Sequence, residues 1–274
     1  MKQFQTFEEF RAEADRIIYA TEQKGIPLRL MGGAAIRIHC PNSEQMYERL
    51  GRKPGKDLDF ATHRKHGKET KELMKSFGYL PIPSPAFYAS SVSKHRQIYV
   101  DEEVYKRDKQ TRLVADVFLD KIKMCHLIEF RDRLEADKYT LPLAELLLQK
   151  VQICEINEKD IKDIIILSRE HEVGDNDNET INSKHIAEVL SNDWGFYHTA
   201  TANLRNAKTY VKDYGDKGML DEDEQSIVNS RIDVLLETIE KEPKTVKWKA
   251  RATVGTKVKW YETVEEVVRD DLSK

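Results

Sequence analysis

Residues 29–39 read Arg-Leu-Met-Gly-Gly-Ala-Ala-Ile-Arg-Ile-His, and residues 56–60 read Lys-Asp-Leu-Asp-Phe. The apolar residues within 28–31 predict a short buried strand. Gly32 and Gly33 predict a tight turn, after which residues 34–39 begin a helix. Glycine lets the backbone approach a ligand closely, and the free N–H groups at a helix start favour an anion. We therefore expect Gly32 and Gly33 to offer N–H groups to phosphates.

The second stretch contains a pair of carboxylates, Asp57 and Asp59, on either side of Leu58. If this stretch is a strand, both carboxylates lie on one face while Leu58 and Phe60 point into the core. Two hard oxygen ligands of this kind suit Mg²⁺, with Mn²⁺ as the alternative, held together with substrate phosphates. Together, the glycine turn and the Asp pair predict a site for a nucleoside triphosphate and its metal.

A third carboxylate, Asp116, lies in a predicted strand over residues 111–120 and has apolar neighbours on both sides. A buried carboxylate is costly without a cation, a hydrogen-bond network or a metal. We favour the metal. The alternatives are an exposed position at a strand end and a register in which Asp120, on the same face, takes this place.

Two helices expected after Pro142 carry further charged candidates. Residues 143–154 are strongly helical, and Lys150 lies within their apolar stripe, where a lysine is unusual. Its side chain either extends past the core to water or reaches a triphosphate. In the next helix Asp160 and Asp163 are three residues apart and share a face.

Composition describes a well-solvated protein of one large domain or two smaller ones. The 274 residues are 39% hydrophobic and 34% charged, with no apolar run of membrane-spanning length and no signal-peptide pattern at the N-terminus. We expect a cytoplasmic protein with no membrane contact. The three cysteines are widely spaced and predict neither a disulfide framework nor a zinc site. A net charge of −3 gives no global attraction to nucleic acid.

The polar stretch 174–180 is the expected boundary between a catalytic domain, 1–173, and a mainly helical domain, 181–274. In the latter we expect helices over 183–190, 194–214 and 222–240. Beyond them, residues 243–262 combine six cations with three aromatic residues. This combination can bind nucleic acid, but a solvated helix face with two core tryptophans is the favoured interpretation.

The order of strand, Gly-Gly turn, helix and Asp-x-Asp strand resembles the nucleotidyltransferase superfamily, and most closely its AbiEii-type toxin-like branch. The resemblance covers about residues 26–170. Lys150, followed by Lys159-Asp160 and Asp163, resembles the leucine-rich helix with a lysine and the acidic helix of that branch. Relatives often show Arg followed by Ser or Thr before the Asp pair, whereas residues 52–56 here are Arg-Lys-Pro-Gly-Lys. The basic group nearest the phosphates therefore stays open.

The resemblance implies an α+β fold with a mixed sheet flanked by helices and a helical C-terminal part. It implies metal-dependent transfer of a nucleotidyl group to an acceptor hydroxyl, with Asp57, Asp59 and Asp116 holding the metal. Asp116 would also act on the attacking hydroxyl, and Lys150 would neutralise the departing pyrophosphate. The residues expected to contact the nucleotide are Gly32, Gly33, Arg37, Lys56, Asp160 and Asp163.

The acceptor stays open between a tRNA end and a small aminoglycoside-like molecule. A toxin of this branch would have an antitoxin partner. Two other classes compete. A glycosyltransferase also uses Asp-x-Asp, but it requires neither the Gly-Gly turn nor Asp116. The other is a non-catalytic protein of the same fold that only binds nucleotide or RNA. The absence of one of the three carboxylates would favour it, but the sequence has Asp at all three positions.

Overall fold

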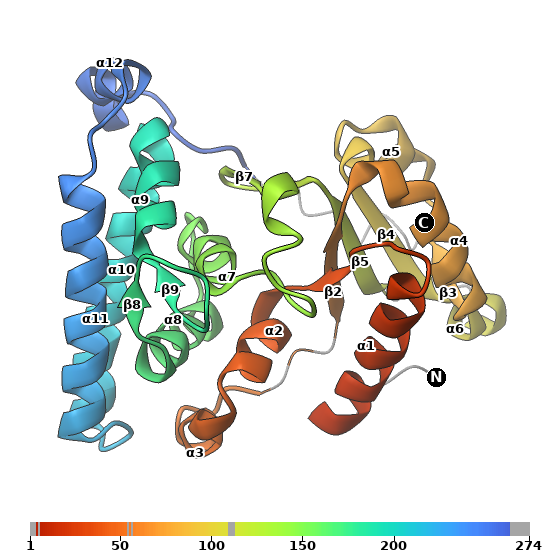
Figure 1. Ribbon diagram of the computed structural model, residues 1–274, viewed down its shortest axis with the longest axis horizontal. Helices are drawn as coiled ribbons and strands as arrows, with labels where there is room; N and C mark the ends of the chain where they lie inside the picture. The colour runs from red at the N-terminus through yellow and green to blue at the C-terminus, as the bar shows by residue number, and fades with distance from the viewer. Residues whose placement is uncertain (1–3, 5, 54, 56, 109–112, 264–274) are drawn as a thin grey trace.

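The computed structural model describes residues 4, 6–53, 55, 57–108 and 113–263. Within these ranges the fold is mixed α and β, with a small mixed sheet among many helices, which confirms this part of the expected fold class. Figure 1 shows the sheet on one side of the molecule and a group of long helices on the other. These helices include α9 (Ser183–Asn192), α10 (Trp194–Asp216) and α11 (Glu222–Lys241), at the three places expected.

The main sheet has the strand order β1-β2-β5-β4-β3. Its strands are β1 (Arg29–Leu30), β2 (Leu58–Thr62), β3 (Tyr79–Pro81), β4 (Arg96–Asp101) and β5 (Leu113–Leu119). Strands β2 and β5 are parallel, whereas the other neighbours are antiparallel. In the β2–β5 register Asp59 lies opposite Asp116. Residues in register on adjacent strands share a face, so the sheet brings these two carboxylates together.

Six α-helices precede α7 in the part of the chain that the structure describes. They are α1 (Phe7–Glu22), α2 (Gly32–His39), α3 (Glu44–Arg49), α4 (Gly67–Ser76), α5 (Pro85–Ala89) and α6 (Glu102–Asp108). Helix α1 begins as its sequence predicts, because the Thr6 hydroxyl accepts a hydrogen bond from the Glu9 N–H at 3.2 Å. The chain leaves it through Gly25, whose φ is +68°.

Helix α7 (Leu143–Val151) is buried on every side. It contacts α2, α8 (Glu158–Glu170), α9 and α10, so it lies between the sheet half and the helical half. A helix surrounded in this way needs apolar residues around its whole circumference. The leucine-rich sequence of α7 supplies them, and its few polar side chains must find partners inside the protein.

The polar stretch 175–180 is a loop between two short paired strands, β8 (Val173–Gly174) and β9 (Ile181–Asn182). The hydrophobic core is continuous across it, from Phe10 in α1 to Ile239 in α11. A hairpin of β6 (Lys121–Lys123) and β7 (Leu127–Glu129) extends from β5. Of the helices in the described ranges, none combines the length and apolar character that a membrane crossing needs.

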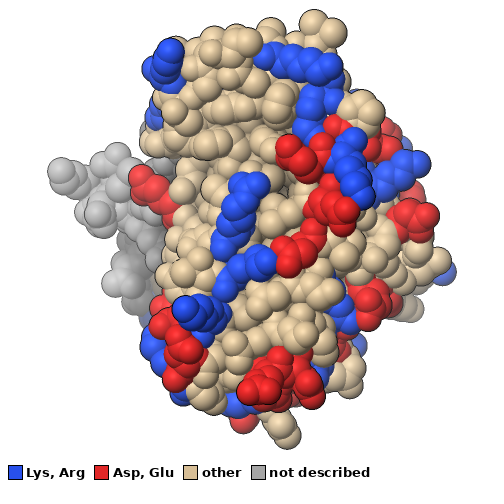
Figure 2. Space-filling model, turned by 90° about the vertical axis from the view of Figure 1, so that its left-hand side faces the viewer, with Lys and Arg blue, Asp and Glu red and all other residues tan. Residues whose placement is uncertain are grey.

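Some of the cations and aromatics of residues 243–262 pack against one another and against α10, whereas Lys247, Lys249 and Lys257 are exposed. In α12 (Val246–Val254) the Arg251 guanidinium lies 4.9 Å from the centre of the Trp194 ring. The Trp260 Nε1–H donates to Thr199 Oγ1 at 3.1 Å. On the face that carries α11, Figure 2 shows basic and acidic side chains next to one another rather than a field of one sign. These contacts favour the packing interpretation over nucleic-acid binding.

The continuous core predicts that the two halves unfold together. All three tryptophans lie in the helical C-terminal part, whereas far-UV circular dichroism also reports on the helices around the sheet. We expect both signals to change at the same urea concentration. Leu147→Ala, at a side chain that is 1% exposed, should lower the free energy of unfolding by about 2–5 kcal/mol and shift both transitions equally.

Leu127→Ala is the control, because Leu127 is 44% exposed and its truncation leaves no cavity. Its cost should stay within about 0.5 kcal/mol. Two separate transitions in the unaltered protein would show that the halves are energetically independent.

Candidate active site

The turn between β1 and α2 packs directly against the Asp59 strand. The Met31 N–H donates to the Asp59 carbonyl oxygen at 2.9 Å. Gly32 follows with φ of +72°, and a Cβ atom there would lie 3.0 Å from Asp59 Oδ2. Both the left-handed backbone and the lack of space require glycine. The predicted glycine turn therefore lies against the predicted carboxylate.

Asp59 carries a strongly perturbed carboxyl group. Burial raises its pKa to about 7, and the charges of Asp116 and Asp57 act in the same direction, while Arg96 and Lys150 act against them. Crowded carboxylates ionise together only when a cation neutralises them. The sheet therefore places Asp59 and Asp116 side by side, whereas Asp57 lies in the bend just before β2, outside the strand that the sequence predicted for it.

Asp116 has one satisfied oxygen and one unsatisfied oxygen. Arg96, on the neighbouring strand β4, donates to Asp116 Oδ2 from Nη2. Oδ1 is buried and has no hydrogen-bond partner among the described residues. A buried carboxylate oxygen without a partner is costly, and a hard divalent cation would satisfy it. Asp59 and Asp116 thus offer oxygen donors of the kind that Mg²⁺ or Mn²⁺ binds, and Asp57, which is exposed in the bend before β2, is the third candidate donor.

Lys150 reaches neither water nor an open surface. Its ammonium group lies 2.7 Å from Asp160 Oδ1 and 2.8 Å from Asp163 Oδ2. Burial opposes the charged form, but the two carboxylates raise the pKa of Lys150 on balance. The shared face of Asp160 and Asp163 in α8 is therefore used to hold this lysine.

Arg52 completes the buried ion cluster. Its Nε and Nη2 donate to Oδ1 and Oδ2 of Asp163 at 2.7 and 2.9 Å. Such a two-point pairing is the strongest that arginine makes with a carboxylate. A Cβ atom on Gly33 would lie 3.0 Å from Asp163 Oδ2 and nearer still to Arg52 Nη2. The ion cluster thus leaves room only for glycine at position 33. Among the residues that the structure describes, Arg52 is the basic residue that lies beside the turn.

Gln149 was not singled out by the sequence. Its Oε1 accepts the Gly32 N–H at 3.1 Å, so one of the donors expected for phosphate is already used. Its Nε2 is buried without a partner among the described residues and is an alternative donor to a ligand. The sequence signal that could have identified Gln149 is its position as a polar residue next to Lys150 in a mainly apolar helix.

Other expected nucleotide contacts lie elsewhere. Arg37 pairs with Glu44 and lies between the rings of Phe7 and Tyr47, each 4.8 Å from its guanidinium carbon. It is the sixth residue of α2, so the helix carries it away from the turn. Asp160 and Asp163 are ion-paired with Lys150 and Arg52, and Asp163 is fully buried. Lys56 lies outside the described residues.

The register alternative for the third carboxylate is not adopted. Asp120 follows β5 with φ of +64°. Its carboxylate accepts the Arg64 N–H at 3.0 Å and pairs with Arg131 at 3.3 Å. Asp116, not Asp120, lies opposite Asp59.

A basic cavity adjoins the carboxylates. Asp116 and Phe118 share a face of β5 because they are two residues apart. Arg96 lies over the Phe118 ring at 5.1 Å, and both residues line the cavity. Its further lining includes His95, Lys121, Lys123 and Glu262, and Lys123 pairs with Glu262 at 3.0 Å. Burial, together with the charge of Lys121, lowers the pKa of His95, which favours its neutral form. The cavity therefore carries more basic than acidic side chains.

Comparisons with protein-family models, with curated proteins and with solved structures give no match to this chain. The resemblance to the nucleotidyltransferase superfamily stays a prediction from the residues.

The ion cluster predicts a large effect of Asp163→Asn on stability. Lys150 and Arg52 together hold the pKa of Asp163 below its usual value, although burial opposes them. Its contribution is therefore present above about pH 4, the unfolded pKa, and is lost as the pH falls below that value. Urea unfolding at pH 7 should show a loss of about 3–5 kcal/mol, with a smaller loss at the lowest pH at which the protein stays folded.

Asp213→Asn is the matched control, because Asp213 pairs with Lys217 on an exposed surface at 2.7 Å. It should cost less than about 1 kcal/mol. Equal losses for the two variants would show that the buried cluster has no special role.

Asp59→Asn should have the opposite effect in the absence of divalent ions. Because the folded pKa of Asp59 is raised to about 7, ionisation of this group destabilises the fold progressively from about pH 4 to pH 7. At pH 8 the variant should be more stable than the unaltered protein, by on the order of 2 kcal/mol. Near pH 5 the gain should largely disappear. Thermal unfolding across this pH range measures the stability difference between the variant and the unaltered protein. A variant that is less stable at both pH values would contradict the raised pKa of Asp59.

Proposed function

We propose that this chain is a metal-dependent nucleotidyltransferase that moves a nucleotidyl group from a nucleoside triphosphate to an acceptor hydroxyl. One observation carries the proposal. Asp59 and Asp116 lie in register on parallel strands beside a glycine turn that opens a helix, and Asp116 retains a buried oxygen that has no partner among the residues the structure describes. Carboxylates that are crowded, partly protonated and incompletely bonded are suited to a divalent cation and its phosphates.

Asp57, Asp59 and Asp116 would hold Mg²⁺, or Mn²⁺ in its place. When bound, this metal supplies positive charge to the triphosphate and to the attacking oxygen. Asp116 Oδ1 is the oxygen that can accept the proton of the acceptor hydroxyl, since its other oxygen is held by Arg96. By holding Oδ2, Arg96 fixes the orientation of the Asp116 carboxylate, with Oδ1 directed to the acceptor hydroxyl.

On the other side of the turn, Arg52 and Lys150 are the cations available to the leaving phosphates. Both are ion-paired with Asp163 in this structure. Phosphate oxygens would therefore bind Arg52 and Lys150 while these cations keep their contacts with the carboxylates. This arrangement makes Lys150 primarily a positioning residue, which fixes Asp163 and the helix start. We retain its role in neutralising pyrophosphate as part of the proposal.

The basic cavity supports a polyanionic acceptor, and we propose an RNA, with the tRNA end as first candidate. Arg96, Lys121 and Lys123 line it together with a single carboxylate, Glu262, whereas a cationic aminoglycoside-like molecule would be suited by a mainly acidic lining. The proposed relation to AbiEii-type toxins adds a protein antitoxin as an expected partner. The non-catalytic alternative, a protein that only binds nucleotide or RNA, retains the same sites without transfer.

The test is transfer of label from each of the four nucleoside triphosphates to total tRNA, with Mg²⁺ and with EDTA. We expect transfer from at least one triphosphate in Mg²⁺ only. Asp59→Asn and Asp116→Asn should each reduce it by at least about 100-fold, since each removes a ligand of the transition-state charge. Their folded state is checked by thermal unfolding.

Asp120→Asn is the control, because Asp120 is the neighbouring carboxylate of the same strand end but pairs with Arg131. It should retain transfer. If Asp59→Asn is folded and transfers label as fast as the unaltered protein, the proposed chemistry is wrong. If the protein binds a triphosphate but transfers no label to RNA, the acceptor is a molecule of another class.

A further inference from the structure

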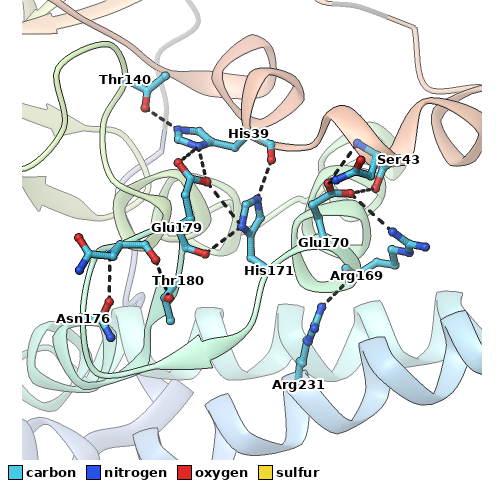
Figure 3. A network of polar contacts seen from close by, with 12 residues as sticks. His39, Ser43, Thr140, Arg169, Glu170, His171, Asn176, Glu179, Thr180 and Arg231 are labelled. Carbon is cyan, nitrogen blue, oxygen red and sulfur yellow. Dashed lines mark hydrogen bonds and ion pairs between the residues drawn. The ribbon is translucent and has the colours of Figure 1, made fainter.

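A second group of metal-ligating side chains lies at the opposite end of α2 from the glycine turn. His39 ends α2, Asp137 lies in the turn that precedes α7, and Glu179 lies in the loop between β8 and β9. One ligand atom from each lies within 4.8 Å of the other two. Figure 3 shows the His39 and Glu179 side chains pointing toward one another, with His171 beside them. Three separate segments of the chain thus meet at one imidazole.

The hydrogen bonds of His39 orient its ring. Its Nε2 lies 2.6 Å from Thr140 Oγ1, and its Nδ1 lies 3.0 Å from a carboxylate oxygen of Glu179. A metal-binding histidine typically donates its other ring N–H to a nearby oxygen, which selects the tautomer and the ring orientation. Thr140 Oγ1 is an oxygen of this kind. With the proton on Nε2, the lone pair of Nδ1 points to the Glu179 side.

Backbone N–H groups orient the Asp137 carboxylate, and His171 holds the backbone of Glu179. Asp137 Oδ1 accepts the N–H groups of Tyr139 and Thr140 at 2.7 and 2.8 Å. These bonds orient the group and use one of its two oxygens. The Glu179 carbonyl oxygen lies 3.1 Å from His171 Nδ1, and His171 Nε2 lies 2.9 Å from the His39 carbonyl oxygen. His171 therefore links the backbones of the two ligand-bearing segments.

Two carboxylates converge on the imidazole of His39. The charge of Arg29 acts on Asp137, but its guanidinium also lies 3.7 Å from Glu22 and so is shared with a carboxylate outside the cluster. A divalent cation would contact both carboxylates at once and satisfy their remaining lone pairs.

We propose that His39, Asp137 and Glu179 bind a divalent transition-metal ion, Zn²⁺ in the first place, with a further position open to water. Zinc bonds of about 2.0–2.2 Å place neighbouring ligand atoms about 3.3–3.6 Å apart. The 3.0 Å between His39 and Glu179 is close to this separation. The wider separations need small movements, for which the Glu179 side chain, 64% exposed, has freedom.

This site differs in chemistry from the carboxylates of β2 and β5. An imidazole nitrogen with two carboxylates suits zinc and similar ions, whereas an all-oxygen site suits magnesium. The site also has a structural consequence. Thr140 lies beside Leu30 of β1 in a parallel bridge. Metal binding would therefore join the end of α2, the strand that leads into it, and the β8–β9 loop, and so fix the helix whose start forms the glycine turn.

The test uses the full chain, stripped with EDTA and titrated with Zn²⁺ alone by calorimetry, with metal content measured after desalting. We expect one tightly bound Zn²⁺ per chain and a rise in melting temperature, because the ion binds the folded state. Glu179→Gln should weaken binding at least about tenfold. Its exposed side chain can be changed without altering the melting temperature of the metal-free protein. Asp137→Asn keeps the Oδ1 acceptor and should weaken binding similarly.

Two controls separate this site from other carboxylates. Glu172→Gln, at an exposed residue paired with Arg231, should bind Zn²⁺ as the unaltered protein does. Asp59→Asn should also retain it. Equal Zn²⁺ affinity in the unaltered protein and Glu179→Gln overturns the proposal, as does loss of the ion in Asp59→Asn, which would place it at the β2–β5 carboxylates. Co²⁺ provides a spectroscopic check, since its visible absorption should disappear with Glu179→Gln.

Discussion

The arrangement of the site depends on one buried ion cluster. Asp163 is fully buried and binds Lys150 and Arg52 together, while Asp160 holds the lysine from the side. These residues come from α8, α7 and the segment after α3, and the cluster fills the space where Gly33 of α2 would carry a side chain. A buried charge is tolerated only with all its partners in place, so four segments are fixed relative to one another. The cluster contributes position more than net stability, because burying the charges opposes much of their mutual attraction.

The glycine turn separates two regions of opposite character. On one side is the ion cluster, in which positive and negative groups are matched at short distance. On the other side, burial together with the charges of Asp116 and Asp57 raises the pKa of Asp59 to about 7. Arg96 neutralises only one oxygen of Asp116. Unmatched negative charge therefore lies beside the turn, and a divalent cation is the group that such an imbalance suits.

Much of the fold was predictable from local pattern. The capped helix α1, the glycine that ends it and the three long C-terminal helices follow from periodicity and end signals that act within a few residues. Alternation assigned each carboxylate to a face of its strand, whereas the placing of Asp116 beside Asp59 was expected only from the family resemblance. Arg96 and Gln149 were missed. Arg96 matters because of strand order, which sequence does not state. Gln149 matters because α7 is buried on all sides, which depends on helices far along the chain.

The sequence by itself determined the elements and the candidate carboxylates, because helix ends, strand alternation and glycine turns are set by interactions between near neighbours in the chain. It also indicated that Lys150 faces inward. Only the tertiary structure decided what Lys150 meets there, that Arg52 occupies the place beside the turn, and that Arg37 is carried away from it. It alone brought His39, Asp137 and Glu179 together from distant segments. The physical reason is that the energy of a charged side chain depends on its partners and its burial, and both are set by packing between segments remote in sequence.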